Sequence, residues 1–178
     1  MGRIFLVGYM GVGKSTVGRM LAREMGFGFI DLDKYIEKRE GRTIARLFKE
    51  KGEGGFREVE RQMLGEVCGL DEVVVATGGG TPCYYNNMEE MKGAGKTVYL
   101  RASVEELAGR IEMSRNVRPV VAGKRGGELR EFIGGSLRQR EVYYMQASLI
   151  WDVPALGTQE DIRELAGGLA GELGKGGD

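Results

Sequence analysis

The hydrophobic pattern of the chain alternates between two periods. Five short runs rich in β-branched and aliphatic residues are typical of buried strands, which we expect at 4–7, 27–32, 73–77, 97–102 and 149–153. Between these runs, apolar residues recur every three to four positions. This spacing predicts helices at 14–25, 33–40, from 43, from 56, at 86–92, from 103, at 128–147 and from 158, with a break at Gly52, Gly54 and Gly55. Strands that alternate with helices predict an α/β domain with a mostly parallel sheet, because each parallel return needs a crossover.

Length and charge limit the class of protein. The 178 residues suit one domain, which we expect at 1–173, followed by a frayed tail from Gly174. Lys plus Arg and Asp plus Glu balance at 26 each, so no overall positive field favours nucleic acid or an anionic membrane as partner. The first apolar run is too short for a signal peptide and no stretch reaches membrane-spanning length, so we expect a cytoplasmic protein. Without a coiled-coil seam we expect a monomer.

The residues that the chain lacks narrow the chemistry further. There is no histidine, which excludes serine-type triads and the usual zinc sites. Cys68 and Cys83 lack metal-like spacing, and we expect both to be reduced. Any proton transfer is therefore left to carboxylates, Lys, Tyr or Cys.

The segment after the first predicted strand carries the clearest motif. It reads Gly8-Tyr9-Met10-Gly11-Val12-Gly13-Lys14-Ser15-Thr16, which fits the phosphate-binding pattern Gly-x-x-x-x-Gly-Lys-Ser/Thr between a strand and a helix. A glycine-rich turn that matches by accident is the alternative, which the flanking elements disfavour. We expect Lys14 to reach the terminal phosphates and Ser15 to contact Mg²⁺. The nucleotide-binding residues would be Gly11, Val12, Gly13, Lys14, Ser15 and Thr16.

Two acidic residues follow the second predicted strand. Asp31 and Asp33 lie where ligands gather in open α/β sheets, beyond the carboxyl end of a strand. If the strand continues that far, alternation puts both on one side. One could hold Mg²⁺ through water and the other accept a hydroxyl proton. The alternative is that one of them caps the following helix.

The residues alone allow two interpretations for each of two later segments. Arg57 and Glu60 share a helix face with Arg61, which is also typical of a solvated charge pair. The run Gly78, Gly79 and Gly80 after the third strand permits close approach of the backbone to a ligand, or forms a loose turn.

A basic segment at 113–127 has no apolar periodicity after its first residue. It carries four cations and no acidic residue, and we expect it to act as a lid over a triphosphate, with a merely solvated loop as the alternative. The four cations are Arg115, Arg118, Lys124 and Arg125. The long helix that follows carries Arg138 and Arg140.

The ordered set of these motifs resembles the shikimate kinases, from Ile4 to about Ile162. The set comprises the phosphate loop, Asp-x-Asp after strand two, Phe-Arg-x-x-Glu at a helix start, Gly-Gly-Gly after strand three, Arg-Pro in the basic segment and a late Arg. The resemblance implies a P-loop fold like that of nucleoside monophosphate kinases, with a five-stranded mostly parallel sheet flanked by helices. It also implies phosphorylation of the 3-hydroxyl of shikimate from ATP with Mg²⁺, a step toward chorismate and the aromatic amino acids.

The resemblance also implies residue roles. Asp31 would lie in the outer shell of Mg²⁺, and Asp33 would bind substrate hydroxyls and be the candidate base. Arg57 and Arg140 would hold the shikimate carboxylate, and Glu60 would position Arg57. Gly78, Gly79 and Gly80 would line the substrate pocket within reach of the substrate-binding region 33–61, and Arg118 would contact ATP from the lid.

The chain departs from the family pattern at two places. The arginine before the lid is displaced by about one position, so Arg110 is an uncertain match. After the fifth strand the chain reads Val153-Pro154-Ala155-Leu156, without a polar side chain, so we expect backbone and apolar contacts to adenine.

Two other functions compete with this interpretation. One is another small-molecule kinase of similar build, such as a gluconate kinase. An uncharged substrate would leave Arg57 and Arg140 without an anionic group to bind. A nucleotide-binding regulatory protein that has lost turnover is disfavoured by the intact Lys14, Ser15 and Asp33. A GTP switch is disfavoured because the chain lacks an Asn-Lys-x-Asp motif.

Overall fold

The structure is a computed structural model that describes residues 2–114 and 119–174. These residues form a five-stranded parallel sheet in the order β2-β3-β1-β4-β5. The strands are β1 (Arg3–Val7), β2 (Gly28–Asp31), β3 (Val73–Ala76), β4 (Lys96–Arg101) and β5 (Leu149–Asp152). The prediction of a P-loop α/β fold with five strands is confirmed, and every pair of neighbouring strands is parallel.

The helices connect successive strands, as the hydrophobic pattern predicts. They are α1 (Lys14–Met25), α2 (Leu32–Glu40), α3 (Ile44–Cys68), α4 (Asn87–Ala94), α5 (Val104–Met113), α6 (Gly126–Tyr144) and α7 (Gln159–Gly174). Two short 3₁₀ helices, η1 (Thr81–Cys83) and η2 (Pro119–Val121), lie in the connections. The rest of the expected tail, 175–178, lies outside the described residues.

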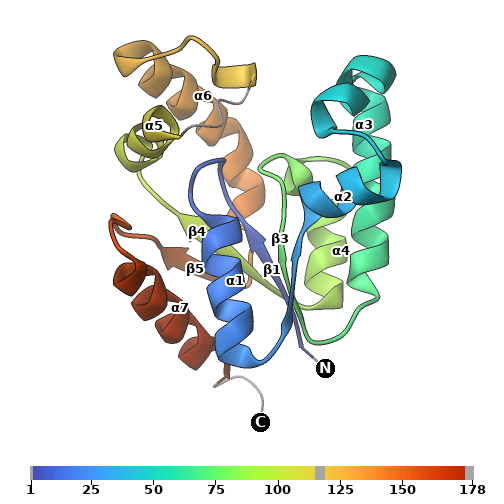
Figure 1. Ribbon diagram of the computed structural model, residues 1–178, viewed down its shortest axis with the longest axis vertical. Coiled ribbons are helices and arrows are strands. Elements are labelled where there is room, and N and C mark those ends of the chain that lie inside the picture. The colour runs from blue at the N-terminus through green and yellow to red at the C-terminus, as the bar shows by residue number, and fades with distance from the viewer. Residues whose placement is uncertain (1, 115–118, 175–178) are drawn as a thin grey trace.

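The helices cover both faces of the sheet, and the strands carry the core. In Figure 1, α1 and α7 lie in front of the sheet, and α4 and the second half of α6 lie behind it. The middle strands are buried on both sides, as the fully buried Phe5, Val75 and Leu100 show. This arrangement explains why their sequences are continuous apolar runs rather than alternating ones.

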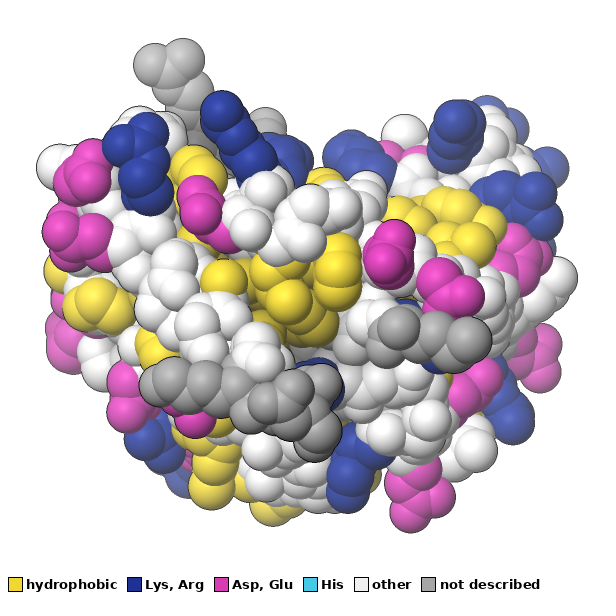
Figure 2. Space-filling view, turned by 90° about the horizontal axis from the view of Figure 1, so that it is seen from below, with side chains coloured by type: hydrophobic (Ala, Val, Ile, Leu, Met, Phe, Trp, Pro, Cys, Tyr) yellow, Lys and Arg dark blue, Asp and Glu magenta, His cyan; other side chains and the backbone are white. Residues whose placement is uncertain are grey.

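The carboxyl ends of the strands point toward one end of the molecule, the top of Figure 1. The loop between β1 and α1 lies there, with α2 and the first part of α3 on one side and α5, η2 and the start of α6 on the other. The opposite end, seen in Figure 2, shows both signs of charge around the rim of an uncharged middle. Within 2–114 and 119–174, the helices are too short or too polar to cross a bilayer.

Several element boundaries differ from the expected ones. The break predicted in α3 occurs at Gly52 alone, which has φ 70° and ψ 179°, whereas Gly54 and Gly55 are helical. Strand β2 ends at Asp31 and α2 begins at Leu32, so the strand alternation expected for Asp31 and Asp33 does not apply. The expected non-helical segment 113–127 is shorter at both ends, because α5 includes Met113 and α6 begins at Gly126. Helix α4 continues past Gly93 to Ala94, and α6 ends at Tyr144.

Candidate functional site

The loop between β1 and α1 curves around the amino end of α1. Gly13 caps this helix with φ 101° and ψ 24°, a left-handed conformation that glycine adopts without strain. Lys14 is 9% exposed, and its ammonium group donates hydrogen bonds to the carbonyls of Gly8 at 2.6 Å and Tyr9 at 3.1 Å. The positive end of the helix dipole and the Lys14 ammonium therefore lie together, which makes the loop suited to bind a polyphosphate.

Ser15 and Asp31 form the edge of this loop. The Ser15 hydroxyl donates a 2.5 Å hydrogen bond to Asp31 Oδ2, and Asp31 Oδ1 accepts one from the backbone nitrogen of Lys34 at 3.2 Å. Asp31 therefore caps α2, as the capping alternative predicts, and also reaches the phosphate loop; its role toward Mg²⁺ stays a prediction. The hydroxyl oxygen of Ser15 and the carboxylate oxygens of Asp31 are the hard ligands that Mg²⁺ prefers.

A metal at this position would depend on the nucleotide. Among residues 2–114 and 119–174, no cluster of three or more His, Cys, Asp or Glu side chains is arranged to hold a metal. Mg²⁺ is often held by one or two protein oxygens together with water and substrate phosphates. Ser15 and Asp31 fit that type of site.

The glycine run after β3 brings three predicted site residues together. A β-carbon built at Gly78 would lie 3.2 Å from Asp33 Oδ1, and one at Gly79 would lie 3.2 Å from Arg140 Nη1. One at Gly80 would lie 2.6 Å from Arg57 Nη2. These three side chains come from α2, α6 and α3, and each lies against its own glycine.

The same glycine run lies against the phosphate loop. A β-carbon at Gly79 would lie 3.4 Å from the backbone nitrogen of Met10 and 3.7 Å from the carbonyl oxygen of Gly8. Thr77, just before the run, donates to the carbonyl of Leu6 through its hydroxyl at 2.8 Å. The carboxylate of Asp33 and the guanidinium groups of Arg57 and Arg140 therefore lie beside the phosphate loop rather than in open solvent.

Arg57 and Glu60 form a buried ion pair. Arg57 Nη1 donates to Glu60 Oε1 at 2.8 Å, and the two residues are 8% and 1% exposed. Burial raises the pKa of the Glu60 carboxyl, an effect that Arg57 and Thr81 oppose. Burial on its own would lower the pKa of Arg57, but the negative charge of Glu60 raises it. The pair keeps a cation at the glycine run, so the interpretation as a solvated surface pair is wrong.

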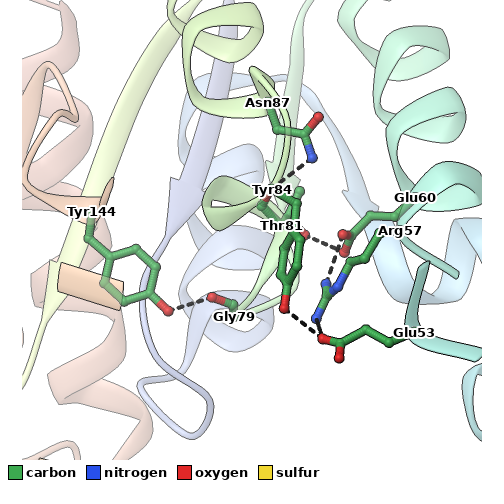
Figure 3. A network of polar contacts seen from close by, with 8 residues as sticks. All are labelled: Glu53, Arg57, Glu60, Gly79, Thr81, Tyr84, Asn87 and Tyr144. Atoms are coloured by element: carbon green, nitrogen blue, oxygen red, sulfur yellow. Dashed lines mark hydrogen bonds and ion pairs between the residues drawn. The ribbon is translucent and has the colours of Figure 1, made fainter. Parts of the chain in front are cut away.

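Glu60 is held in turn from η1 and α4. The Thr81 hydroxyl donates to Glu60 Oε2 at 2.8 Å, and Asn87 Nδ2 donates to the Thr81 carbonyl at 2.9 Å. Figure 3 shows this series of contacts running from Asn87 to Arg57. The Nε of Arg57 is buried and has no hydrogen-bond acceptor among the described residues. Such a buried donor without a partner calls for an explanation.

Arg140 is enclosed by two tyrosines. Its Cζ lies 5.7 Å from the ring centroid of Tyr9, within the range of a cation–π contact. The Tyr144 hydroxyl donates to the carbonyl of Gly79 on the far side of Figure 3 from Arg57. Burial raises the pKa of Tyr144, and the nearby positive charge of Arg140 opposes that rise. Tyr144 therefore ties the end of α6 to the glycine run, next to Arg140.

Arg110 connects the phosphate loop to the segment after β5. Its guanidinium group donates to the carbonyls of Val12 at 2.6 Å and Pro154 at 2.9 Å. A β-carbon at Gly13 would lie 3.8 Å from Arg110 Nη1 and 3.9 Å from Leu156 Cδ1. The apolar segment expected near adenine is thus adjacent to the phosphate loop, and Arg110 is part of the same region.

One predicted residue cannot be placed. Arg118 lies outside the described residues, as do Arg115 and the two residues between them. Its contact with ATP stays a prediction.

The sequence analysis missed the aromatic residue closest to Arg57. The Tyr84 ring centroid lies 4.1 Å from Arg57 Cζ, and the Tyr84 hydroxyl donates to Glu53 Oε1 at 2.6 Å. Thr81 was also missed. The Tyr84-Tyr85 pair, which three residues separate from the glycine run, was a visible signal, but nothing in the sequence identifies the partner of either ring.

Comparisons with known proteins agree with this geometry. A family model described as shikimate kinase matches residues 10–166. The chain is 49% identical to a shikimate kinase of Parabacteroides distasonis over 169 residues, which cover 95% of this chain and 98% of that one. A crystal structure of shikimate kinase from Bacteroides thetaiotaomicron has a TM-score of 0.92 at 44% identity, covering 97% and 98% of the two chains. The shikimate kinase of Acinetobacter baumannii in complex with shikimate has a TM-score of 0.86 at 32% identity, covering 99% and 95%.

Proposed function

This chain belongs to the shikimate kinase family, and we propose that it phosphorylates the 3-hydroxyl of shikimate at the junction of the phosphate loop and the glycine run. Enzymes of this family use ATP with Mg²⁺ and act in aromatic biosynthesis. The observation that carries the proposal is the contact of Asp33, Arg140 and Arg57 with three consecutive glycines beside the loop. Two guanidinium groups next to a phosphate loop can bind a carboxylate, so the site suits a phosphoryl acceptor that carries both a hydroxyl and a carboxylate.

The nucleotide would bind at residues 11–16. Backbone N–H groups of the loop and of the first turn of α1 would hold its phosphates, and Lys14 would exchange the carbonyls of Gly8 and Tyr9 for phosphate oxygens. Ser15 and Asp31 would hold Mg²⁺, which neutralises charge on the β- and γ-phosphates when bound. Arg110, Pro154 and Leu156 would lie beside the nucleoside.

The acceptor would be held by its carboxylate. Arg57 offers Nε, and Arg140 approaches the same glycine run from α6. Planar guanidinium groups bind a carboxylate in a fixed orientation, which Lys would not reproduce. This orientation would direct the hydroxyl of shikimate toward Asp33. Phosphoryl transfer has a loose transition state, so we expect Asp33 chiefly to orient the hydroxyl and accept its proton late.

The remaining parts of the proposal concern the lid, the extent of the domain, the cellular location and the oligomeric state. We assign 33–61 to substrate binding and 113–127 to a lid that carries Arg118, within a single domain at 1–173. In that lid, Val121 of η2 is 2% exposed and packs into the core, which anchors one end of the segment. A cytoplasmic location and a monomeric state are also part of this proposal.

The test is release of ADP from Mg-ATP with shikimate, quinate, gluconate and nucleoside monophosphates supplied in turn. We expect turnover with shikimate to exceed turnover with each of the others by orders of magnitude. Preference for gluconate would support a gluconate kinase instead. Binding of ATP without release of ADP for any acceptor would support a regulatory protein.

A further inference from the structure

The side chain of Tyr84 lies against the guanidinium group of Arg57. Three aromatic rings surround that group, and the Tyr84 centroid is nearest to Cζ at 4.1 Å, compared with 5.2 Å for Phe56 and 5.9 Å for Phe48. Figure 3 shows the Tyr84 side chain next to Arg57, with its hydroxyl directed toward Glu53. A contact this short is favourable for a cation over an aromatic face, more so when partly removed from water.

The other contacts of Arg57 leave two of its donors, Nε and Nη2, without a hydrogen-bond acceptor in the described part of the chain. Nη1 is taken by Glu60 at 2.8 Å, and Gly80 lies against Nη2, Nη1 and Cζ. No residue in the described ranges accepts from Nε, and the ion-pair partner of Nη2 is Glu53 at 3.9 Å, beyond hydrogen-bonding range. The Nε and Nη2 donors form the parallel fork that a carboxylate binds through both oxygens.

The Tyr84 ring is itself held at its far end. Its hydroxyl donates to Glu53 Oε1 at 2.6 Å, which raises the pKa of the phenol. Glu53 directly follows the kink at Gly52 in α3, so the bond joins the second part of α3 to the residue after η1. Arg57 lies one turn further along the same helix. The ring is therefore fixed at both ends, by η1 at its backbone and by Glu53 at its hydroxyl.

The neighbouring residue repeats the arrangement away from the site. The Tyr85 ring centroid lies 4.9 Å from Cζ of Arg61, four positions after Arg57 on α3. Tyr85 is 52% exposed, and neither it nor Arg61 is among the atoms nearest to a β-carbon built at Gly78, Gly79 or Gly80. The chain thus contains two tyrosine–arginine contacts between the same two segments, and only the first lies at the buried cation.

We propose that Tyr84 is a positioning residue for the anionic acceptor: its ring fixes the plane of the Arg57 guanidinium that binds the carboxylate. This inference rests on the proposed function, in which Arg57 binds the carboxylate of shikimate. It adds a residue that acts on substrate affinity through Arg57, without contact with the phosphoryl group.

The test compares Tyr84→Leu, Tyr84→Phe and Tyr85→Leu with the unmodified protein in steady-state kinetics. Tyr84→Leu removes the ring, and we expect the KM for shikimate to rise about tenfold while the KM for ATP stays within about twofold. Tyr84→Phe keeps the ring and should stay within about threefold for both substrates. Tyr85→Leu removes an equal ring at the exposed contact and should leave both KM values unchanged.

Each other result has a distinct meaning. Equal shikimate KM values in Tyr84→Leu and Tyr85→Leu would overturn the proposed role of Tyr84 and leave the proposed function of the enzyme intact. A parallel rise in the KM values for shikimate and ATP in Tyr84→Leu would mean that the ring supports the fold. A shikimate KM that is as high in Tyr84→Phe as in Tyr84→Leu would assign the effect to the hydroxyl. Either result overturns the proposal. An unmodified protein that releases no ADP with shikimate would overturn the proposed function, and the role of Tyr84 with it.

Discussion

The guanidinium group of Arg57 lies so close to the α-carbon of Gly80 that a β-carbon there would come within 2.6 Å of Nη2 and 2.8 Å of Nη1. Gly80 itself has φ −93° and ψ −12°, a conformation open to any residue. The requirement for glycine therefore comes from the neighbouring cation and not from the backbone. A side chain at this position would act on Arg57 alone.

Gly80→Ala should accordingly displace Arg57 without unfolding the chain. Because the clash is with the end of a flexible side chain, we expect the shikimate KM to rise on the order of tenfold and the ATP KM to stay unchanged. Gly93→Ala is the matched control, since a β-carbon there meets no described atom within 4 Å. Gly93 lies in α4, and its replacement should stabilise the protein by up to about 1 kcal/mol in thermal or denaturant unfolding. Equal shikimate KM values in the two variants would show that Arg57 is not displaced.

Lys14 and Arg57 should affect different kinetic parameters. Lys14→Ala removes charge that stabilises the transferring phosphoryl group, so kcat should fall by about a hundredfold or more. Arg57→Lys keeps a charge opposite the buried Glu60 but loses the planar fork, and it should chiefly raise the KM for shikimate. Arg57→Ala is less informative, because it would leave Glu60 charged, buried and unpaired. Similar changes in kcat and in the shikimate KM for both variants would contradict the separate roles.

The fold was predictable because local and long-range signals agree. The apolar runs that become β1, β3 and β4 are buried on both faces, and the phosphate loop fixes the first strand and helix. The prediction of a break at Gly54 and Gly55 was wrong. A glycine lowers helix propensity by only about 1 kcal/mol, and tertiary packing overrides this cost. The neighbouring Phe56 and Val59 are buried in the core and hold that turn in place.

The candidate site was predictable only in part. Arg57 and Glu60 are three residues apart on one helix, so their pairing could be read from the spacing, but their burial could not. Tyr84 and Tyr144 reach their partners from elements distant in sequence, the second across 65 positions to Gly79. Such contacts depend on how the helices pack, which periodicity does not determine. The family resemblance identified Arg140, which no local pattern distinguishes from Arg138.

The capping role of Asp31 and its proposed role toward Mg²⁺ can be separated by one substitution. Asp31→Asn keeps a side chain that caps α2 but removes the negative charge beside Ser15. We expect activity to need several-fold more Mg²⁺ for half-saturation, with little change in the melting temperature. Asp31→Ala should show the same shift and also lose about 1 kcal/mol of stability with the cap. An unchanged Mg²⁺ requirement in Asp31→Asn would remove Asp31 from the metal site.

The two cysteines should resist alkylation at neutral pH. In the described part of the chain both are free thiols, and burial raises the pKa of Cys68 and Cys83 to about 11 each. Since the thiolate is the reactive form, and it becomes abundant only as pH rises toward that value, labelling by iodoacetamide at pH 8 should be at least about tenfold slower than that of an exposed cysteine. The rate should then increase steadily up to about pH 10. Mass spectrometry of Cys68→Ser and Cys83→Ser would follow each thiol separately, with urea-unfolded protein as the fast control. Rapid labelling of Cys83 at pH 8 in the folded protein would contradict its burial beside Arg57 and Arg140.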